Sequence, residues 1–254
     1  MSGASDGPKN GAGQQGAGGK RISMIKLGSA ARRRLAAGAL LLVLIGGAVL
    51  WWQARTWMPD RARYQVQGLW LDANDAPVDW HVLGARGADF VYLTASVGAG
   101  QRDSAFAAGL EAAQKQSMQA GAVHVYDLCS AADAQAANFV TTVPRDPALL
   151  PPAIALDLGS PSCPQPPGEA AMQSELTTFL NQIEKHVGKP AILMLSSEIE
   201  SHYHLASMID RNLWAAQDFI EPGYVGRPWV MWTANRHLRI DGVLGPVRWV
   251  VVQP

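Results

Sequence analysis

An uncharged apolar run near the N-terminus constrains this chain more than any other feature. From Leu35 to Trp52 the sequence is LAAGALLLVLIGGAVLWW, 18 residues without a charged side chain. As a helix this run would be roughly 27 Å long, close to the thickness of the hydrocarbon layer of a membrane. The run therefore predicts one transmembrane helix at residues 35–52, with the lipid bilayer as its partner.

The charges that flank this run predict its orientation. Seven of the 21 basic residues precede it, including three consecutive arginines at 32–34, but only Asp6 of the 21 acidic residues does. Because positively charged flanks tend to stay in the cytoplasm, we expect the N-terminus inside and a C-terminal domain in the periplasm, held at the inner membrane. A cleaved signal peptide is the alternative, but bulky tryptophans close the run where a cleavage site needs small residues.

Composition divides the chain into further parts. Residues 1–34 are rich in Gly, Ala, Ser and Gln, and we expect a disordered basic cytoplasmic tail. Residues 53–63 form a short juxtamembrane linker, and residues 64–254 are long enough for one domain. The chain after the basic tail holds 14 basic and 20 acidic residues. This balance argues against nucleic-acid binding, which needs clustered Lys and Arg to neutralise phosphates.

Cys129 and Cys163 are the two cysteines of the chain. In an exported domain such a pair is more naturally a disulfide than a metal site, because two thiolates leave a zinc ion short of ligands. His202 and His204 have the alternate spacing of metal ligands but no carboxylate or thiol cluster beside them. We therefore predict one disulfide, no metal and no cofactor.

From residue 64 onward, short apolar strands alternate with amphipathic helices. This alternation predicts parallel strands with helices outside them, and about eight strands predict a closed α/β barrel. In such barrels the chemistry lies at the C-terminal ends of the strands. The expected strands are 67–71, 90–95, 122–126, 153–157, 191–196, 214–216, 229–232 and 249–252, and the expected helices are 79–86, 105–120, 131–143 and 170–187.

Several segments follow one another in the order of a known family. They are GLWLD at 68–72, VDW at 78–80, FVYL at 90–93, QAGAVH at 119–124, QAANF at 135–139, LPPAIALD at 150–157, LWAA at 213–216, WVMW at 229–232 and GVLG at 242–245. Together they resemble glycoside hydrolase family 25, the lysozyme-like muramidases, over about residues 65–252. The resemblance implies a TIM-like, flattened (β/α) barrel, peptidoglycan as the substrate class, and cleavage between N-acetylmuramic acid and N-acetylglucosamine.

The same resemblance identifies catalytic carboxylates that this sequence lacks. Glycoside hydrolysis needs an acid to protonate the leaving oxygen and a second carboxylate or substrate group to stabilise the oxocarbenium-like centre. Trp70, Val97, Gly159 and Arg248 stand at four of the matching positions, and Asp157 alone keeps a carboxylate. Asp157 is therefore the candidate catalytic residue, or else a relic that holds a neighbouring hydrogen bond. Without a proton donor, ordinary muramidase action is not expected.

Relocated carboxylates are the route by which activity would survive. Asp72 follows Trp70 by two residues, so in an extended strand both side chains point to the same face. Asp75, Asp79 and Asp127 also lie near expected strand ends.

Aromatic side chains give the cleft a second possible use, because aromatic faces stack against sugar rings. Glycan binding without cleavage is therefore expected, with burial in the barrel core as the alternative. His124 matches the family's cleft histidine, although a strand histidine is as often simply hydrogen-bonded to a neighbour. The candidate substrate-binding residues are Trp70, Tyr92, His124, Tyr126, Trp214 and Trp232.

Three functions follow from these patterns. The leading one is a membrane-anchored, lysozyme-like domain that binds peptidoglycan or a partner, with little or no muramidase activity. The second is an active muramidase with relocated carboxylates, and the third is a structural or protein-interaction domain.

Overall fold

The computed structural model describes residues 29–158 and 163–254. Most of the expected disordered tail, and the position of Gly159, lie outside the described residues. Helix α1 spans Ser29–Ala54, and its part from Arg32 onward contains an 18-residue window with a mean hydropathy of 2.2 and no buried residue. This helix is long and apolar enough to cross a membrane, and a signal sequence near the N-terminus would pass the same test.

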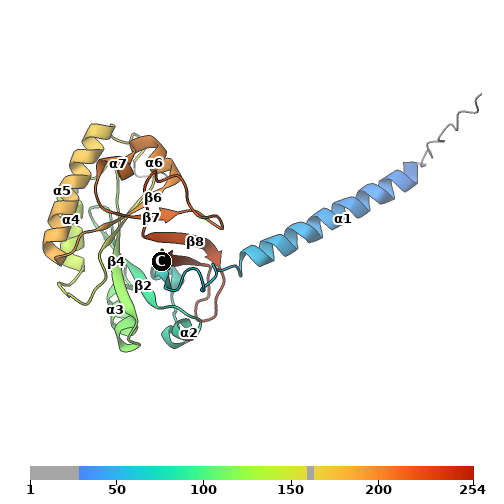
Figure 1. Ribbon diagram of the computed structural model, residues 1–254, viewed down its shortest axis with the longest axis horizontal. Coiled ribbons are helices and arrows are strands. Elements are labelled where there is room, and N and C mark those ends of the chain that lie inside the picture. The colour runs from blue at the N-terminus through green and yellow to red at the C-terminus, as the bar shows by residue number, and fades with distance from the viewer. Residues whose placement is uncertain (1–28, 159–162) are drawn as a thin grey trace, which may run out of the picture. The chain divides into compact units, whose positions relative to one another are not determined.

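In the described part of the chain, one sheet forms in the order β1-β9-β8-β7-β6-β5-β4-β2-β3, and pairing of β1 with β2 closes eight of these strands into a barrel (Figure 1). The two-residue strand β3 makes a hairpin with the end of β2. The barrel confirms the predicted α/β fold class. The strands are β1 Gln67–Leu71, β2 Phe90–Val97, β3 Gln101–Arg102, β4 Gln119–Val125, β5 Ala153–Leu156, β6 Ile192–Ser196, β7 Asn212–Ala216, β8 Met231–Leu238 and β9 Val247–Val252.

Helices cover the outside of the barrel between its first strands, and Figure 1 shows the long helix α5 beside α4 on one flank. The helices α6 and α7 that follow β6 are not among the predicted ones, and α6 contains His202. The helices after α1 are α2 Trp80–Ala85, α3 Phe106–Lys115, α4 Ala132–Thr142, α5 Glu169–Val187, α6 Ser197–Tyr203 and α7 Leu205–Met208, and the 3-10 turn η1 spans Ala73–Asp75.

The expectation of parallel pairing throughout the barrel is wrong for its last strand. Strand β9 runs antiparallel to both β8 and β1. The connection explains this: residues 239–246 join β8 to β9 without a helix, and a chain that turns back directly enters the sheet antiparallel. As a result, the start of β9 lies beside the C-terminal end of β1.

Among the element boundaries that differ from the expected ones, two differ most. Strand β8 continues to Leu238, beyond the expected end at residue 232, because polar residues such as Thr233 and Asn235 still pair with β9. Helix α3 ends at Lys115 rather than at residue 120, because Gln119 already pairs with β2. In both places strand pairing determined the structure, and the hydrophobic pattern did not reveal it.

Aromatic and aliphatic side chains fill the inside of the barrel, and two glycines provide the room. A Cβ atom at Gly68 would lie 2.3 Å from the carbonyl oxygen of Phe90, and one at Gly121 would lie 2.4 Å from the ring of Tyr92. Neither position can hold a larger residue without moving its neighbours. The interior cluster contains Phe90, Tyr92, Val123, Ala153, Ala155, Ile192, Met194, Trp214, Met231 and Val250, with Trp70 partly buried against it.

A second, larger core lies between the barrel wall and the helices. Leu69 and Leu71 of β1 belong to it, whereas Trp70 between them faces the barrel interior, as the two-residue period of a strand requires. Helices α4 and α5 contribute Phe139 and Phe179 to this outer layer.

Residues 53–63, expected as a linker, are bound to the barrel. Gln67 donates from Nε2 to the carbonyl of Pro59 at 3.1 Å, and Arg61 pairs with Asp89 at 2.9 Å. The chain divides into two compact units after residue 47. This segment and the end of α1 therefore belong to the same packed unit as the barrel.

His124 points into the outer layer and is fully buried. Its Nδ1 lies 2.8 Å from Oγ of Ser96, its Nε2 lies 3.2 Å from Oε1 of Gln135, and its ring centroid lies 4.8 Å from that of Phe179. Burial lowers the pKa of His124 to about 4, against the opposing effect of the Gln135 hydrogen bond. The folded protein therefore keeps this imidazole neutral.

His124 predicts a pH-dependent stability. Because its folded pKa lies below the ordinary value of 6.5, the stabilisation is present above 6.5 and is lost as the pH falls towards 4. We expect a loss of up to about 3 kcal/mol in the free energy of unfolding over this range, measured by chemical denaturation in detergent. His124→Gln should remove this dependence, whereas the exposed His81→Gln should keep it. Equal pH slopes for wild type and His124→Gln would contradict the prediction.

Candidate functional site

The C-terminal ends of the parallel strands form one mouth of the barrel, where a site is expected. Asp157 follows β5 directly and is exposed. Ala153 and Ala155 of β5 face the barrel interior, so the alternation of the strand directs Asp157 to the same side, at its upper end. Asp157 is thus placed at the mouth.

Arg248 and Trp70 face each other across the pairing of β1 with β9. The guanidinium carbon of Arg248 lies 4.0 Å from the centroid of the Trp70 ring, a close cation–π contact. Nε of Arg248 also donates to the carbonyl oxygen of Trp70 at 3.1 Å. Trp70 and Arg248, the two residues predicted to replace family carboxylates on β1 and β9, therefore bind each other.

The same guanidinium joins two aspartates at the end of β1. Nη2 of Arg248 lies 2.7 Å from Oδ2 of Asp72 and 3.2 Å from Oδ2 of Asp75. Each carboxylate also caps the backbone of η1: Asp72 accepts from the Asn74 N–H, and Asp75 accepts from the Asp72 N–H, both at 2.8 Å. We call Trp70, Asp72, Asp75 and Arg248 the mouth cluster.

The two aspartates of the mouth cluster have pKa values shifted in opposite directions. Burial raises the pKa of Asp72, but the hydrogen bond and positive charge of Arg248 together with two hydrogen bonds from Asn74 outweigh it, so that its pKa lies below the ordinary value. At Asp75 burial dominates over the backbone hydrogen bond and over Arg248, so its pKa is raised. Pairs of carboxylates with opposite shifts can serve as base and acid, but here both bind one guanidinium.

The other relocated carboxylates also have structural partners. Asp79 is the N-cap of α2, where its Oδ1 accepts from the Val82 N–H at 3.1 Å. Asp127 accepts from the hydroxyl of Ser130 at 2.6 Å and from the Cys129 N–H at 3.1 Å. These contacts stabilise a helix start and a turn.

Three of the predicted aromatic residues meet inside the barrel. The ring centroid of Trp214 lies 5.0 Å from that of Tyr92 and 6.3 Å from that of Trp70, both edge-on. The indole N–H groups of Trp70 and Trp214 donate to the hydroxyls of Thr94 and Thr233, at 2.9 and 2.8 Å. Tyr92 and Trp214 are fully buried, so only Trp70 offers accessible surface.

The other three predicted residues lie in the outer layer. His124 and Tyr126 pack against Phe179 of α5. Trp232 packs against Trp57 and Tyr64, with centroid distances of 6.3 and 5.8 Å. The structure therefore does not bring these three residues together with Trp70.

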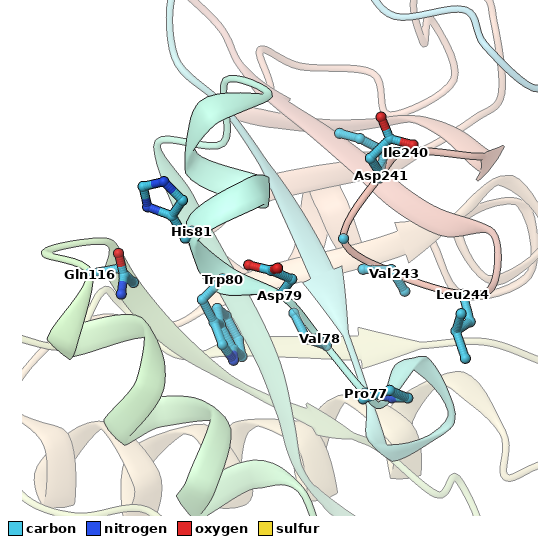
Figure 2. A pocket seen from close by; sticks show the side chains of 11 residues that line it. Pro77, Val78, Asp79, Trp80, His81, Gln116, Ile240, Asp241, Val243 and Leu244 are labelled. Atoms are coloured by element: carbon cyan, nitrogen blue, oxygen red, sulfur yellow. The ribbon is translucent and has the colours of Figure 1, made fainter.

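A groove of about 750 Å³ lies beside α2. Figure 2 shows residues 77–81 on one side of it and residues 240–244 on the other. Its Asp79 caps α2, and its Asp241 pairs with Arg86, so both carboxylates are already engaged. No group of three or more His, Cys, Asp or Glu able to hold a metal occurs among residues 29–158 and 163–254.

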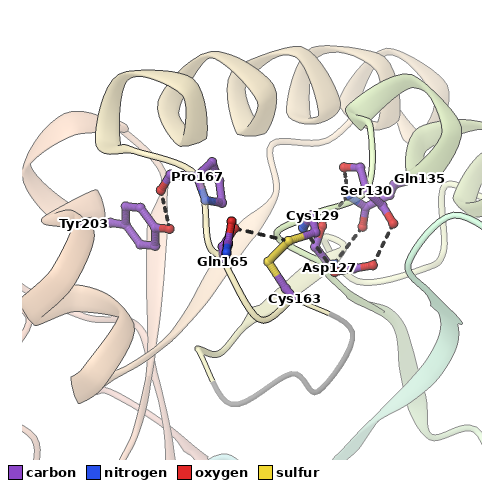
Figure 3. The surroundings of a disulfide bond; sticks show 8 residues. All are labelled: Asp127, Cys129, Ser130, Gln135, Cys163, Gln165, Pro167 and Tyr203. Atoms are coloured by element: carbon purple, nitrogen blue, oxygen red, sulfur yellow. Dashed lines mark hydrogen bonds between the residues drawn. A yellow bond between two sulfur atoms is a disulfide. The ribbon is translucent and has the colours of Figure 1, made fainter.

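The predicted disulfide is confirmed. Cys129 follows β4, Cys163 precedes α5, and their Cα atoms are 5.2 Å apart (Figure 3). Further along the loop that contains Cys163, the carbonyl of Pro167 accepts a hydrogen bond from the hydroxyl of Tyr203 in α6 at 2.7 Å. The disulfide thus connects the loops that follow β4 and β5, close in sequence to Asp157.

The mouth cluster itself was not predicted as a unit. The sequence predicted that Asp72 shares a face with Trp70 and that Arg248 stands at the position of a family aspartate, but it gave no sign that the guanidinium of Arg248 would contact both residues. The antiparallel entry of β9 creates this contact, and the helix-free connection at 239–246 was the available signal.

Comparison with solved structures shows the same fold elsewhere. A family 25 glycosyl hydrolase from Bacillus anthracis is 24% identical with a TM-score of 0.70, over 78% of this chain and 92% of that chain. A bacterial lysozyme from Streptomyces coelicolor is 20% identical with a TM-score of 0.66, over 74% and 92%. A muramidase from Trichobolus zukalii is 19% identical with a TM-score of 0.62, over 74% and 93%.

No curated protein sequence aligns significantly with the chain. The model of the glycosyl hydrolases family 25 matches residues 71–243, a segment that begins at the end of β1 and includes the strands from β2 to β8. The family model thus covers more than half of the chain, and the barrel agrees with the solved structures of family members. The chain belongs to glycosyl hydrolases family 25.

Proposed function

We propose that this chain is a membrane-anchored domain that binds peptidoglycan in the periplasm with little or no muramidase activity. The observation that carries the proposal is the mouth cluster. Trp70 and Arg248 stand where the family resemblance places catalytic carboxylates, and they bind each other instead.

The charge of Arg248 opposes the family's chemistry. Glycoside cleavage passes through an oxocarbenium-like centre, which carries positive charge and is stabilised by a carboxylate or a substrate group. A guanidinium at that mouth repels such a centre, and the carboxylates of Asp72 and Asp75 are held by the same guanidinium. In this proposal cleavage lacks a proton donor at the positions of Trp70 and Arg248, and Asp157 is the one family carboxylate that remains at the mouth.

An active muramidase would need a pair of carboxylates directed at a substrate. Asp72 and Asp75 pair with Arg248, Asp79 caps α2, and Asp127 holds the turn that contains Cys129. These engagements favour binding over cleavage.

Side chains that solvent can reach at the mouth support glycan binding. Trp70 is partly exposed, and Asp157 is exposed at the end of β5. An indole surface and a carboxylate are suited to the apolar faces and hydroxyl groups of sugars. The family's substrate class makes the glycan strand of peptidoglycan the proposed ligand.

The proposed location follows from α1 and from the disulfide. The apolar helix has the length of a membrane span, and a triple arginine precedes its apolar core, which favours a cytoplasmic N-terminus. The disulfide between Cys129 and Cys163 fits an oxidising compartment outside the cytoplasm.

Binding and cleavage can be measured on the same sample. We expect the full chain in detergent to co-sediment with purified peptidoglycan without releasing reducing ends, because the mouth can contact sugars but cannot protonate a leaving oxygen. Trp70→Ala should weaken co-sedimentation several-fold, whereas Leu244→Ala, a change at another exposed side chain, should not. Release of reducing ends by the wild type that is lost in Asp72→Asn or Asp157→Asn would overturn the proposal of little or no muramidase activity. Absence of co-sedimentation would overturn glycan binding.

The mouth cluster also predicts a stability effect. Arg248→Met leaves Asp72 and Asp75 side by side without a cation, so we expect the free energy of unfolding at neutral pH to fall by about 1–3 kcal/mol. Because Arg248 is the largest of the groups that lower the pKa of Asp72 from its ordinary value of 3.8, its stabilisation in the wild type is present above 3.8 and is lost at lower pH.

The difference between wild type and Arg248→Met should therefore shrink in acid. Chemical denaturation across this range measures it, and the additional change Asp75→Asn should restore part of the neutral-pH stability. A difference that stays constant with pH would show that Arg248 acts through packing on Trp70 alone.

A further inference from the structure

The end of α1 is fastened to one edge of the barrel. Asn235 of β8 donates from Nδ2 to the carbonyls of Ala54 and Trp57, at 2.8 and 2.9 Å. The Arg239 N–H donates to the carbonyl of Arg55 at 2.7 Å. Since Asn235 is fully buried, this attachment belongs to the core of the unit formed by residues 48–254.

Aromatic packing brings a loop of the barrel beside the same attachment. The ring of Trp57 lies 5.8 Å from that of Phe219, edge-on, and Trp51 lies 5.9 Å from the ring of His237 at the end of β8. Residues 218–220 therefore lie next to the point where the helix leaves the barrel.

This region exposes large apolar side chains. Ile220 is 67% exposed and Phe219 is 38% exposed, although Phe219 also packs on Trp57. Trp51 and Trp52, on the last turns of the helix, are 51% and 68% exposed. In the described barrel unit outside the helix and its connector, Val66 and Leu244 are the other large hydrophobic residues of this kind.

The backbone holds the loop in its exposed position. Phe219 has a φ of +65°, a conformation that costs a bulky residue about 1–2 kcal/mol. Its N–H donates to the carbonyl of Ala234 in β8 at 2.7 Å, which retains the loop against the strand. A strained position that leaves Ile220 in water needs another source of stabilisation.

Charged side chains of both signs lie near these apolar side chains. Arg55 lies over the Trp51 ring at 4.8 Å, and Arg239 is exposed just after β8. Asp218 and Glu221, which flank Phe219 and Ile220, pair with Arg236 and Arg63 at 2.9 and 2.5 Å, so the arginines offset both carboxylates. Tryptophan and isoleucine beside arginine match the boundary of a bilayer, where rings sit among headgroups and cations meet anionic phosphates.

We propose that this face of the barrel, formed by Trp51, Trp52, Phe219, Ile220, Arg236 and Arg239, rests on an anionic phospholipid bilayer. The proposal depends on the membrane span of α1 proposed above and goes beyond it. This contact fixes the orientation of the barrel on the membrane: Phe219 and Ile220 enter the interfacial layer of the bilayer, and the arginines lie at the headgroups.

A single fluorescent label tests this contact of the barrel with the bilayer. Because Cys129 and Cys163 are joined in a disulfide, Ile220→Cys supplies one reactive thiol in the full chain, reconstituted into nanodiscs that contain phosphatidylglycerol. The matched control is Thr178→Cys, an exposed position on α5. Strands β6 and β7 separate β5, which precedes α5, from β8, and Figure 1 shows α5 on the flank of the barrel away from β8.

An environment-sensitive dye at residue 220 should emit at shorter wavelength and be quenched by headgroup nitroxide lipids, whereas the dye at residue 178 should behave as in water. Water-like emission at both positions, from a chain that resists extraction by alkaline carbonate, would overturn the contact of the barrel with the bilayer but not the membrane span of α1. Release of the chain by carbonate would overturn both. An unchanged midpoint of thermal unfolding ensures that Ile220→Cys still folds.

Discussion

The guanidinium of Arg248 lies over the indole of Trp70 and binds the carboxylates of Asp72 and Asp75. This contact exists because β9 enters the barrel antiparallel and so brings its first residues beside the end of β1. Arg248 thus places a cation where the family resemblance predicts a carboxylate. If the predicted replacements hold at the other strand ends as well, this chain has the fold of its family without the family's chemistry, which is what we propose.

Much of the fold could be predicted because its signals are local. The apolar strands and the long amphipathic helix α5 depend on short-range periodicity. The ordered motifs, and with them the place of Trp70 at the cleft, followed from the family resemblance. The direction of β9 and the polar half of β8 could not be predicted in this way. They depend on which strand lies next to which, and Thr233 and Asn235 are polar residues whose strand conformation comes from pairing.

The contacts of the site could not be predicted, and the replacement of the family carboxylates, which came from matching motifs, stays a prediction. Alternation alone could not tell that His124, Tyr126 and Trp232 belong to the outer layer while Tyr92 and Trp214 are buried inside the barrel. Whether a side chain faces the interior depends on the bulge in β2 and on the register of neighbouring strands. Similarly, residues 53–63 have the composition of a linker, yet Asn235 and Gln67 bind them through backbone carbonyls, which composition does not reveal.

We propose that the mouth holds sugars without hydrolysing them. The most direct test is to incubate the full chain with purified peptidoglycan in water enriched in oxygen-18 and to analyse the glycan fragments by mass spectrometry, because each hydrolytic event places one solvent oxygen on the new reducing end. We predict no incorporation above that of a heat-denatured sample. Incorporation that depends on folded protein and is abolished by Asp157→Asn would contradict the account, since it would show that a carboxylate at this mouth still performs the family's reaction.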